Sequence, residues 1–292
     1  MSEAIRTMGE LLALLSALLF GATHFFNGLL ARRVHSTAVA LIGQVGGTVL
    51  ALVVAPFVAA PHVGGGALGW GALSGVGTGL GVAFLYRGMS GGRFSVVVPL
   101  SDVAAVALPV LVGITFLGDR PGVAAWCGIG AAPAALWLVS RSGHTGGTGD
   151  ADGRGRTASG ARDGLIAGTG FALQFIALAQ ADPAAGLWPL VASRAASVLV
   201  LLPTVARHAD RLRMPGRLAW SCVGAGALGT AAITMYALAT REQLLSLAVV
   251  LTALYPAIPV VLAMTFLHER LTRAQQFGLV CAGAAIALIS LA

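Results

Sequence analysis

Long apolar segments follow one another along the whole chain, separated by short polar connections. Each segment has 18 to 24 residues, and about 20 apolar residues in a helix span the hydrocarbon core of a bilayer. The pattern therefore predicts an all-α integral membrane protein with ten transmembrane helices. We expect these helices at residues 11–31, 37–60, 67–86, 94–117, 123–140, 164–181, 186–206, 218–239, 245–267 and 274–292.

One connection is longer and more polar than the others. Residues 141–162 are rich in Gly, Ser and Thr, a composition typical of a flexible linker. This segment leaves five predicted helices on each side of it. We therefore expect two five-helix domains, residues 1–140 and 163–292, joined by a flexible polar linker.

The two halves are related in sequence. A shift of 150 residues aligns 70–140 with 220–290 without a gap, and residues that are rare in this chain coincide. The coincident pairs include Trp70 with Trp220, Gly79 with Gly229, Tyr86 with Tyr236, Pro109 with Pro259, and Arg120 with Arg270. With five helices each, the halves would enter the membrane in opposite orientations. Such inverted repeats are typical of secondary transporters that work by alternating access, with the substrate site at the repeat interface.

Composition supports the membrane interpretation and argues against a nucleic-acid partner. Only 10% of the residues are charged and 57% are hydrophobic, whereas soluble domains carry about 25% charged residues. The 40 glycines suit close helix packing in lipid. A pI near 10.6 in a soluble protein would suggest nucleic-acid binding. Here, however, the basic residues lie in short loops with almost no aromatic residues among them.

The distribution of arginine predicts an orientation. All 18 basic residues are Arg. Three lie on the side of the predicted bundle that holds the termini, fourteen lie on the other side, and Arg194 lies inside a span. Because basic loops stay in the cytoplasm, we expect the 141–162 linker inside the cell and both termini outside. The expected location is the plasma membrane.

Short motifs in both halves resemble EamA-type domains of the drug/metabolite transporter superfamily. Phe20–Thr23 resembles their aromatic-glycine-small-polar signature, and Leu251–Pro256 resembles their fourth helix. Phe266–Thr272, followed by Gly278, resembles their Gly-Glu-Arg-Leu-Thr turn and fifth helix. Phe116–Arg120 is the version of this turn in the first half, with Asp in place of Glu.

The resemblance implies a ten-helix transporter of small metabolites, often an exporter of amino acids or related compounds. In that family helices one to four and six to nine surround a central cavity. Two departures matter. The basic loops lie opposite the termini, the reverse of the usual arrangement, so either the chain is inserted inverted or one helix is miscounted. The first span also lacks the carboxylate with which small multidrug resistance proteins couple drug to protons, which argues against a cationic-drug pump of that type.

Three ionisable residues lie well inside predicted spans, where a charge costs about 2.5–3.5 kcal/mol on insertion scales. Arg194 is a candidate for binding a substrate carboxylate or phosphate, with Asp102 as its counter-ion or as a proton acceptor. Their similar depth makes an Asp102–Arg194 ion pair possible, and a purely structural pair is the alternative. His24 could be protonated near neutral pH or simply pack against neighbouring helices.

Polar uncharged residues at spanning depth complete the candidate substrate site. Gln44 and Gln174 each bury an amide that needs partners, so each faces a cavity or another helix. Tyr255 lies beside Pro256, which interrupts helical hydrogen bonding. The remaining candidates are Asn27, Thr234 and Thr252. We expect no catalytic residue, metal or cofactor.

Transport is the function that these patterns favour. We expect a secondary transporter of a small metabolite, such as an amino acid or other small organic compound, and an exporter rather than an importer. Its partners would be the substrate, the lipid bilayer, and a coupling proton or exchange substrate, in a monomer or homodimer. The alternatives are a membrane-embedded enzyme, which would need clustered catalytic side chains, and a sensor or scaffold without a central cavity.

Overall fold

The structure is a computed structural model that describes residues 3–31, 33–90, 94–140, 153–206, 212–255, 257–267 and 273–290. Over these residues the chain is helical and contains no β-strand. The prediction of an all-α chain is therefore confirmed for the described ranges.

The helices follow the predicted apolar segments closely. The first half contains α1 (Glu3–Ala31), α2 (Ser36–Val54), the 3-10 turn η1 (Ala55–Phe57), α3 (Gly65–Ser90), α4 (Phe94–Phe116) and α5 (Val123–Ser140). The second half contains α6 (Gly153–Ala179), the 3-10 turn η3 (Pro183–Ala185), α7 (Trp188–Ala206), α8 (Gly216–Glu242), α9 (Leu245–Thr252), α10 (Ala257–Leu267) and α11 (Arg273–Ser290).

Helix α6 begins earlier than the sequence suggested. Residues 141–152 of the predicted linker lie outside the described residues, but 153–162 form the first turns of α6. This part of the predicted linker is therefore helical. Once the apolar part of α6 is fixed by packing, each further residue adds a backbone hydrogen bond at little cost, and the Ala and Arg residues of this segment favour helix.

The predicted span at 245–267 is interrupted. The chain turns at residues 253–255 between α9 and α10, where Tyr255 N donates to the Thr252 carbonyl at 3.3 Å and Leu254 N to the Leu251 carbonyl at 3.4 Å. These bonds span three residues instead of four and tighten the last turn of α9. The following residue in the sequence is Pro256, which has no N–H to continue the helical ladder.

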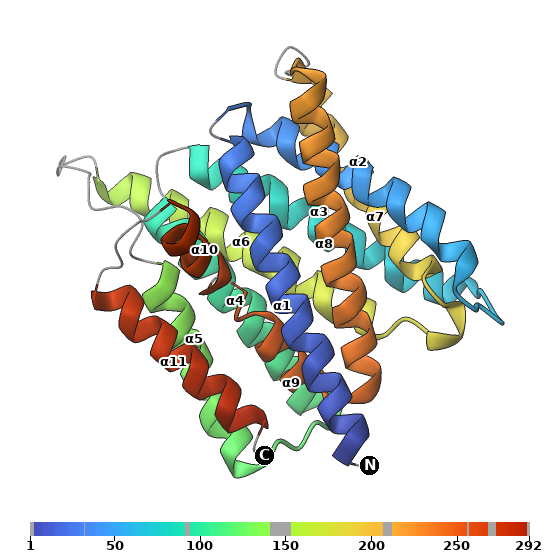
Figure 1. Cartoon of the computed structure of the whole chain (residues 1–292), viewed down its shortest axis with the longest axis vertical. Coiled ribbons are helices and arrows are strands. Elements are labelled where there is room, and N and C mark those ends of the chain that lie inside the picture. Colours follow the sequence, from blue (N-terminus) through green and yellow to red (C-terminus); the bar gives the residue numbers. More distant parts are fainter. Residues whose placement is uncertain are drawn as a thin grey trace.

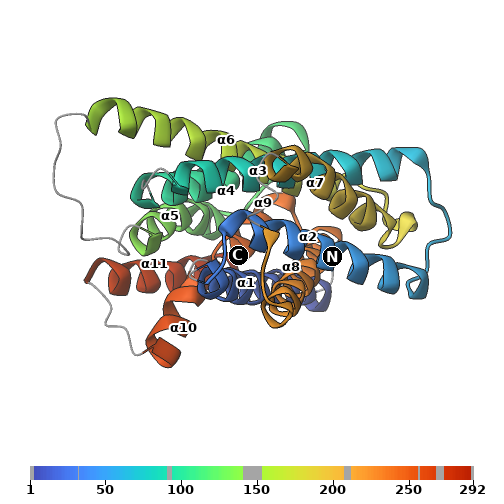
Figure 2. The ribbon, with the colours of Figure 1, turned by 90° about the horizontal axis from the view of Figure 1, so that it is seen from above.

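Helices of the two halves interleave. Helix α3 packs along α6 and α1 along α8, while α2 contacts α7, and α5 pairs with α11 at one edge of the bundle (Figures 1 and 2). Let α1 to α5 correspond in order to α6, α7, α8, the α9–α10 pair and α11. When each helix is replaced by its counterpart in the other half, the α3–α6 contact becomes the α8–α1 contact. The α2–α7 and α5–α11 contacts become themselves. The contact pattern agrees with two related halves.

Helix α9 lies in the centre of the bundle. All of its residues are buried, and it is surrounded by α1, α4, α5, α8 and α11, as the view from above also shows (Figure 2). The carboxylate of Asp119, in the turn after α4, accepts a hydrogen bond from Ser246 N at 2.8 Å. This contact satisfies one of the unpaired N–H groups at the start of α9 and joins the first half to the second.

Several helices have the length and composition of membrane spans. Within the described residues, four meet both criteria: Thr7–Ala31, Ser36–Phe57, Gly65–Leu85 and Gly216–Glu242. Four further apolar helices are shorter: Leu100–Phe116, Val123–Ala135, Trp188–Pro203 and Gln276–Ala285. The chain is therefore a multi-pass membrane protein, and the total of ten crossings stays a prediction.

Glycines allow the interleaved helices to approach closely. A Cβ atom added at Gly226 of α8 would overlap the backbone of Gly43 on α2, and one added at Gly75 of α3 would overlap the Ser193 carbonyl on α7. Small residues at such contacts let helix backbones touch in an environment where packing, instead of hydrophobic transfer, drives association.

This packing gives a direct prediction. Gly226→Ala should lower the thermal unfolding temperature of the detergent-purified protein, because overpacking of a tight contact costs about 1–3 kcal/mol. Gly224→Ala is the matched control on the same helix, since no atom lies within 4 Å of its added Cβ and Ala favours helix by about 1 kcal/mol over Gly. Equal unfolding temperatures for the two variants would contradict the proposed contact.

Candidate functional site

A cationic side chain is buried between α2, α7 and α8. Arg194 of α7 is only 7% exposed. Its Nη1 donates to Oε1 of Gln44 on α2 at 3.0 Å, and its Nη2 donates to the carbonyl oxygen of Gly229 on α8 at 3.1 Å. The Nε atom is buried and has no hydrogen-bond partner among the described residues. A guanidinium with five N–H donors is therefore held by neutral oxygens.

Arg194 has no acidic partner in the part of the chain that the structure describes. The ion pair found there joins Arg87 of α3 to Asp163 of α6 at 2.6 Å. Asp102 instead accepts a hydrogen bond from Tyr255. The possible Asp102–Arg194 ion pair was therefore wrong. The two residues have similar depth, but Asp102 on α4 faces the α9–α10 turn, whereas Arg194 faces α2 and α8.

The contact between Gln44 and Arg194 joins the first half of the chain to the second. The two residues are 150 positions apart, the same offset that aligns 70–140 with 220–290. A neutral amide of the first half therefore binds a cation of the second.

Gln174, a second predicted amide, is held by a network between α3, α6 and α7. Its Oε1 accepts from the Thr78 hydroxyl at 2.6 Å, and its backbone carbonyl accepts from the Ser74 hydroxyl at 3.0 Å. Ser193, the residue before Arg194, donates to the Ser74 oxygen at 3.2 Å. Both predicted glutamines thus face other helices, and polar contacts continue from Arg194 into the α3–α6 interface.

A second polar cluster joins α1, α4 and the α9–α10 turn. The Tyr255 hydroxyl donates to Oδ1 of Asp102 at 2.8 Å. The Tyr255 ring stacks on His24, with ring centroids 4.5 Å apart. Nδ1 of His24 lies 2.7 Å from the Phe20 carbonyl oxygen, and because a carbonyl only accepts, Nδ1 carries the proton and Nε2 is left for another partner. Three predicted site residues therefore meet here.

The two clusters approach each other through α1. Thr23, the neighbour of His24, packs against Gly229, whose carbonyl binds Arg194. Phe20 lies one turn earlier, with its ring centroid 6.0 Å from that of Tyr255 and 6.3 Å from that of Phe175 on α6. Polar and aromatic side chains from both halves therefore lie together along α1, with His24 exposed and Phe175 buried.

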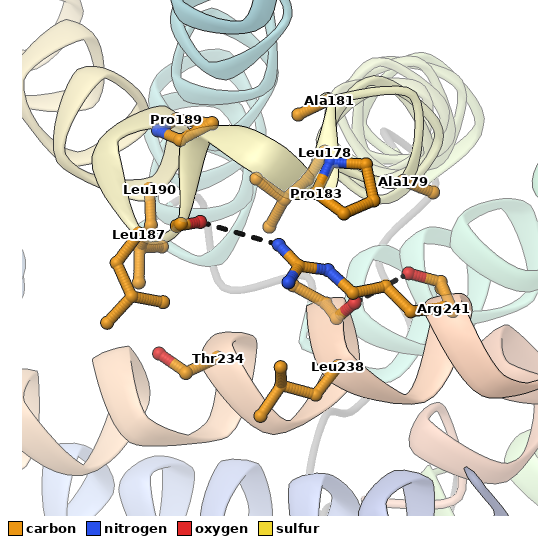
Figure 3. Close-up of a pocket in the computed structure, with 13 residues that line it drawn as sticks. Leu178, Ala179, Ala181, Pro183, Leu187, Pro189, Leu190, Thr234, Leu238 and Arg241 are labelled. Atoms are coloured by element: carbon orange, nitrogen blue, oxygen red, sulfur yellow. Dashed lines mark hydrogen bonds between the residues drawn. The ribbon is translucent and has the colours of Figure 1, made fainter. Parts of the chain in front are cut away.

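A pocket lies between α6, α7 and α8 at the end of the bundle where α8 ends (Figure 3). Its volume is about 100 Å³. Thr234, a predicted site residue, lines it together with Thr240 and Arg241, and polar and apolar surface contribute almost equally to its walls. Arg241 donates to the Gly186 carbonyl at 3.4 Å. Leu190, which also lines the pocket, lies one helical turn before Arg194 on α7.

The remaining predicted residues do not share one cavity. Thr252 is fully buried at the end of α9, and its hydroxyl lies 3.4 Å from the Ala13 carbonyl oxygen. Asn27 is partly buried on α1, and its Oδ1 has no hydrogen-bond partner among the described residues. Neither contacts Arg194 or Asp102 in the described hydrogen bonds.

Sequence reasoning missed two features of this region. Ser197 donates to Oε1 of Gln44 at 3.1 Å and supports the Arg194 contact; its position one turn after Ser193 was the available signal. Arg241 was assigned to a loop, although it lies in the last turn of α8 and lines the pocket. Tyr236, named above only as a repeat position, is fully buried and donates to the Phe175 carbonyl at 2.9 Å. Within the described residues no three His, Cys, Asp or Glu side chains form a group that could hold a metal.

Comparisons with known proteins agree with this architecture. A solved structure titled "Crystal structure of protein" superimposes with a TM-score of 0.73 at 15% sequence identity, over 100% of this chain and 98% of that chain. At that identity the likeness shows the fold alone. No curated protein matches the chain.

The sequence model of one family matches the chain twice. The model of the EamA-like transporter family matches residues 7–141 and again residues 163–291. The two matches together cover nearly the whole chain, and members of this family are transporters of small molecules and not enzymes. The chain belongs to the EamA-like transporter family.

Proposed function

We propose that this protein is a secondary transporter that moves a small organic anion by alternating access, with Arg194 as the residue that binds the carboxylate or phosphate of the substrate. Amino acids and related metabolites, which carry a carboxylate, are the substrate class that this residue suits. Export is the proposed direction, in keeping with the expectation from the sequence.

The observation that carries the proposal is the buried cation, which has no acidic partner among the described residues. Moving a charged group out of water costs several kcal/mol even after the protein relaxes, and two neutral oxygens offset only part of that cost. A glutamine at position 194 could also join α7 to α2 through the Gln44 amide without burying a charge. The charge is explained if an anion binds there, and Arg is well suited to carboxylates and phosphates because its planar fork matches their geometry.

The difference between the two ends of the bundle supports alternating access. At one end the Arg87–Asp163 ion pair joins α3 to α6, and the Arg87 guanidinium also lies 4.5 Å from the centre of the Phe84 ring. At the other end lies the pocket between α6, α7 and α8. Two inverted five-helix halves, crossing the membrane ten times, would interconvert this state with one in which the other end of the bundle is open. The proposed orientation puts the ion pair in the cytoplasmic half and the pocket in the outer half.

The site favours transport over the alternatives. A membrane-embedded enzyme would need several catalytic groups around one point, whereas within the described residues the Arg194 guanidinium donates to one amide oxygen and one backbone carbonyl. A scaffold would have no need of a buried cation next to a pocket.

Transport assays in reconstituted vesicles test the role of Arg194. Arg194→Gln should lower uptake or efflux of carboxylate substrates about 10- to 100-fold, because a charge-assisted hydrogen bond contributes about 1.5–3 kcal/mol. Arg213→Gln, a change of an exposed arginine, is the matched control and should transport normally. If Arg194→Gln transported anionic metabolites as well as the unmodified protein did, Arg194 would not be the anion-binding residue.

Asp102 is the proposed carrier of a coupling proton. It is a carboxylate at spanning depth, 6% exposed, held by Tyr255 from the opposite half. Protonation would weaken that contact at the α9–α10 turn, where the helix is already interrupted. A pH gradient could in this way bias the conformational change.

Asp102→Asn imitates the permanently protonated side chain. We expect it to retain exchange of labelled for unlabelled substrate but to lose accumulation driven by an imposed pH gradient. Glu242→Gln, which neutralises a carboxylate at the end of α8, should retain both. Accumulation by Asp102→Asn equal to that of the unmodified protein would remove Asp102 from the coupling mechanism.

A further inference from the structure

The pocket at the end of α8 is lined by a cationic side chain, Arg241, that has no role in the site around Arg194. We propose that Arg241 and the pocket form a separate outer binding subsite for a small carboxylate with a short aliphatic part, on the route between the outside and Arg194. This inference rests on the proposed transport function and adds a second anion-binding position to it.

The guanidinium of Arg241 retains free donors. It makes one long hydrogen bond, 3.4 Å to the Gly186 carbonyl, and within the described residues no carboxylate lies within ion-pair distance of it. The nearest acidic groups are Asp182 and Glu242, and Asp182 accepts from Ala184 N at 2.9 Å to cap η3. Because an arginine side chain has five N–H donors, Arg241 can bind both oxygens of a carboxylate.

The walls of the pocket define what can accompany that carboxylate. Leu178, Leu187, Leu190 and Leu238 supply apolar surface, and the Thr234 hydroxyl lies on the α8 side (Figure 3). A volume of about 100 Å³ is several times what one water molecule requires. The pocket therefore has room for a carboxylate with a few methylene groups.

The backbone around Gly186 fixes the carbonyl that orients Arg241. Gly186 has a φ of +57°, a backbone conformation that residues other than glycine rarely adopt. A Cβ added there would lie 2.9 Å from the Ala59 carbonyl oxygen in the segment after α2. The turn between η3 and α7 is thus held in one conformation, with its carbonyl directed at the guanidinium (Figure 3).

The pocket leads toward Arg194 along two helices. On α7, Leu190 lines the pocket and Arg194 follows four residues later, about 6 Å along the axis. On α8, Thr234 lines the pocket, and its hydroxyl donates to the Thr230 carbonyl at 2.8 Å. Gly229, whose carbonyl binds Arg194, is the residue before Thr230. Residues of the pocket and of the Arg194 contact therefore lie four and five positions apart on the same two helices.

Cysteine modification tests the subsite without requiring transport. In a background with Cys127, Cys222 and Cys281 replaced by Ser, Leu238→Cys places a thiol in the pocket. The quantity compared is the modification rate with anionic sulfonatoethyl methanethiosulfonate divided by the rate with the cationic trimethylammonium-ethyl reagent. We expect this ratio to be several-fold higher with Arg241 present than in the variant that also carries Arg241→Gln. Constant ionic strength is needed because salt screens this attraction.

Protection by a defined probe gives the second readout. Sodium butyrate should slow modification of Leu238→Cys at least two-fold more than butyramide does at the same concentration, and Arg241→Gln should abolish the difference. Equal reagent preference with and without Arg241, or equal protection by butyrate and butyramide, would overturn the subsite and leave Arg241 as an anchor for the η3–α7 turn.

The outcome separates this inference from the proposed function. Loss of anion transport in Arg194→Gln, together with protection that is independent of Arg241, would refute the subsite alone. Normal transport in Arg194→Gln, together with protection by butyrate that depends on Arg241, would refute the role of Arg194 and keep the subsite.

Discussion

Burial of the Arg194 guanidinium is the constraint on which the central region depends. A cation inside an apolar bundle is stable only where neighbouring helices bring oxygen atoms to it. Three helices meet this demand: α2 through the Gln44 amide and α8 through the Gly229 carbonyl, while α7 carries the arginine itself. These contacts require the helices of the two halves to approach closely, and glycines make the approach possible. At Gly226 and Gly43 the backbones of α8 and α2 touch, three residues before Gly229 and one residue before Gln44.

The same principle governs the second cluster. Asp102 receives the Tyr255 hydroxyl from the other half, and Asp119 receives Ser246 N at the start of the buried helix α9. Each of these two carboxylates of the first half thus accepts a hydrogen bond from a donor of the second half. Polar contacts at depth therefore tie the halves together at a few points, whereas most of the interface is apolar. The two halves can move relative to each other as rigid units when substrate binding replaces one of those few contacts or protonation breaks it.

Much of the fold follows from the sequence because the membrane leaves few choices. The apolar lengths predicted where the helices lie, and the rare residues at a 150-residue spacing predicted the duplication. The interruption at 253–255 was signalled by Pro256 but not predicted as a separate helix, because proline within a span can also produce a simple kink. The early start of α6 was missed because Gly and Ser suggested a linker, whereas packing of the later turns extends the helix.

Individual site residues were predictable from burial cost, but their partners were not. His24, Asp102 and Arg194 stood out because a charge at spanning depth needs a reason. Depth alone cannot tell which face of a helix a residue occupies, so the Asp102–Arg194 pair was wrong, and the partners Gln44 and Tyr255 emerge only from the packing. Arg241 resembled any basic residue at a helix end, and only the pocket around it distinguishes it.

The most direct test compares the ligand-free stability of the protein with that of Arg194→Met. Methionine has a similar length without the charge, and Oε1 of Gln44 would keep its hydrogen bond from Ser197. If Arg194 is retained for anion binding at a cost to stability, thermal unfolding of the purified variant in detergent should occur at the same or a higher temperature. A destabilisation of about 3–5 kcal/mol, the cost of breaking a buried structural pair, would show that Arg194 holds the fold together and would contradict its role as a substrate-binding cation.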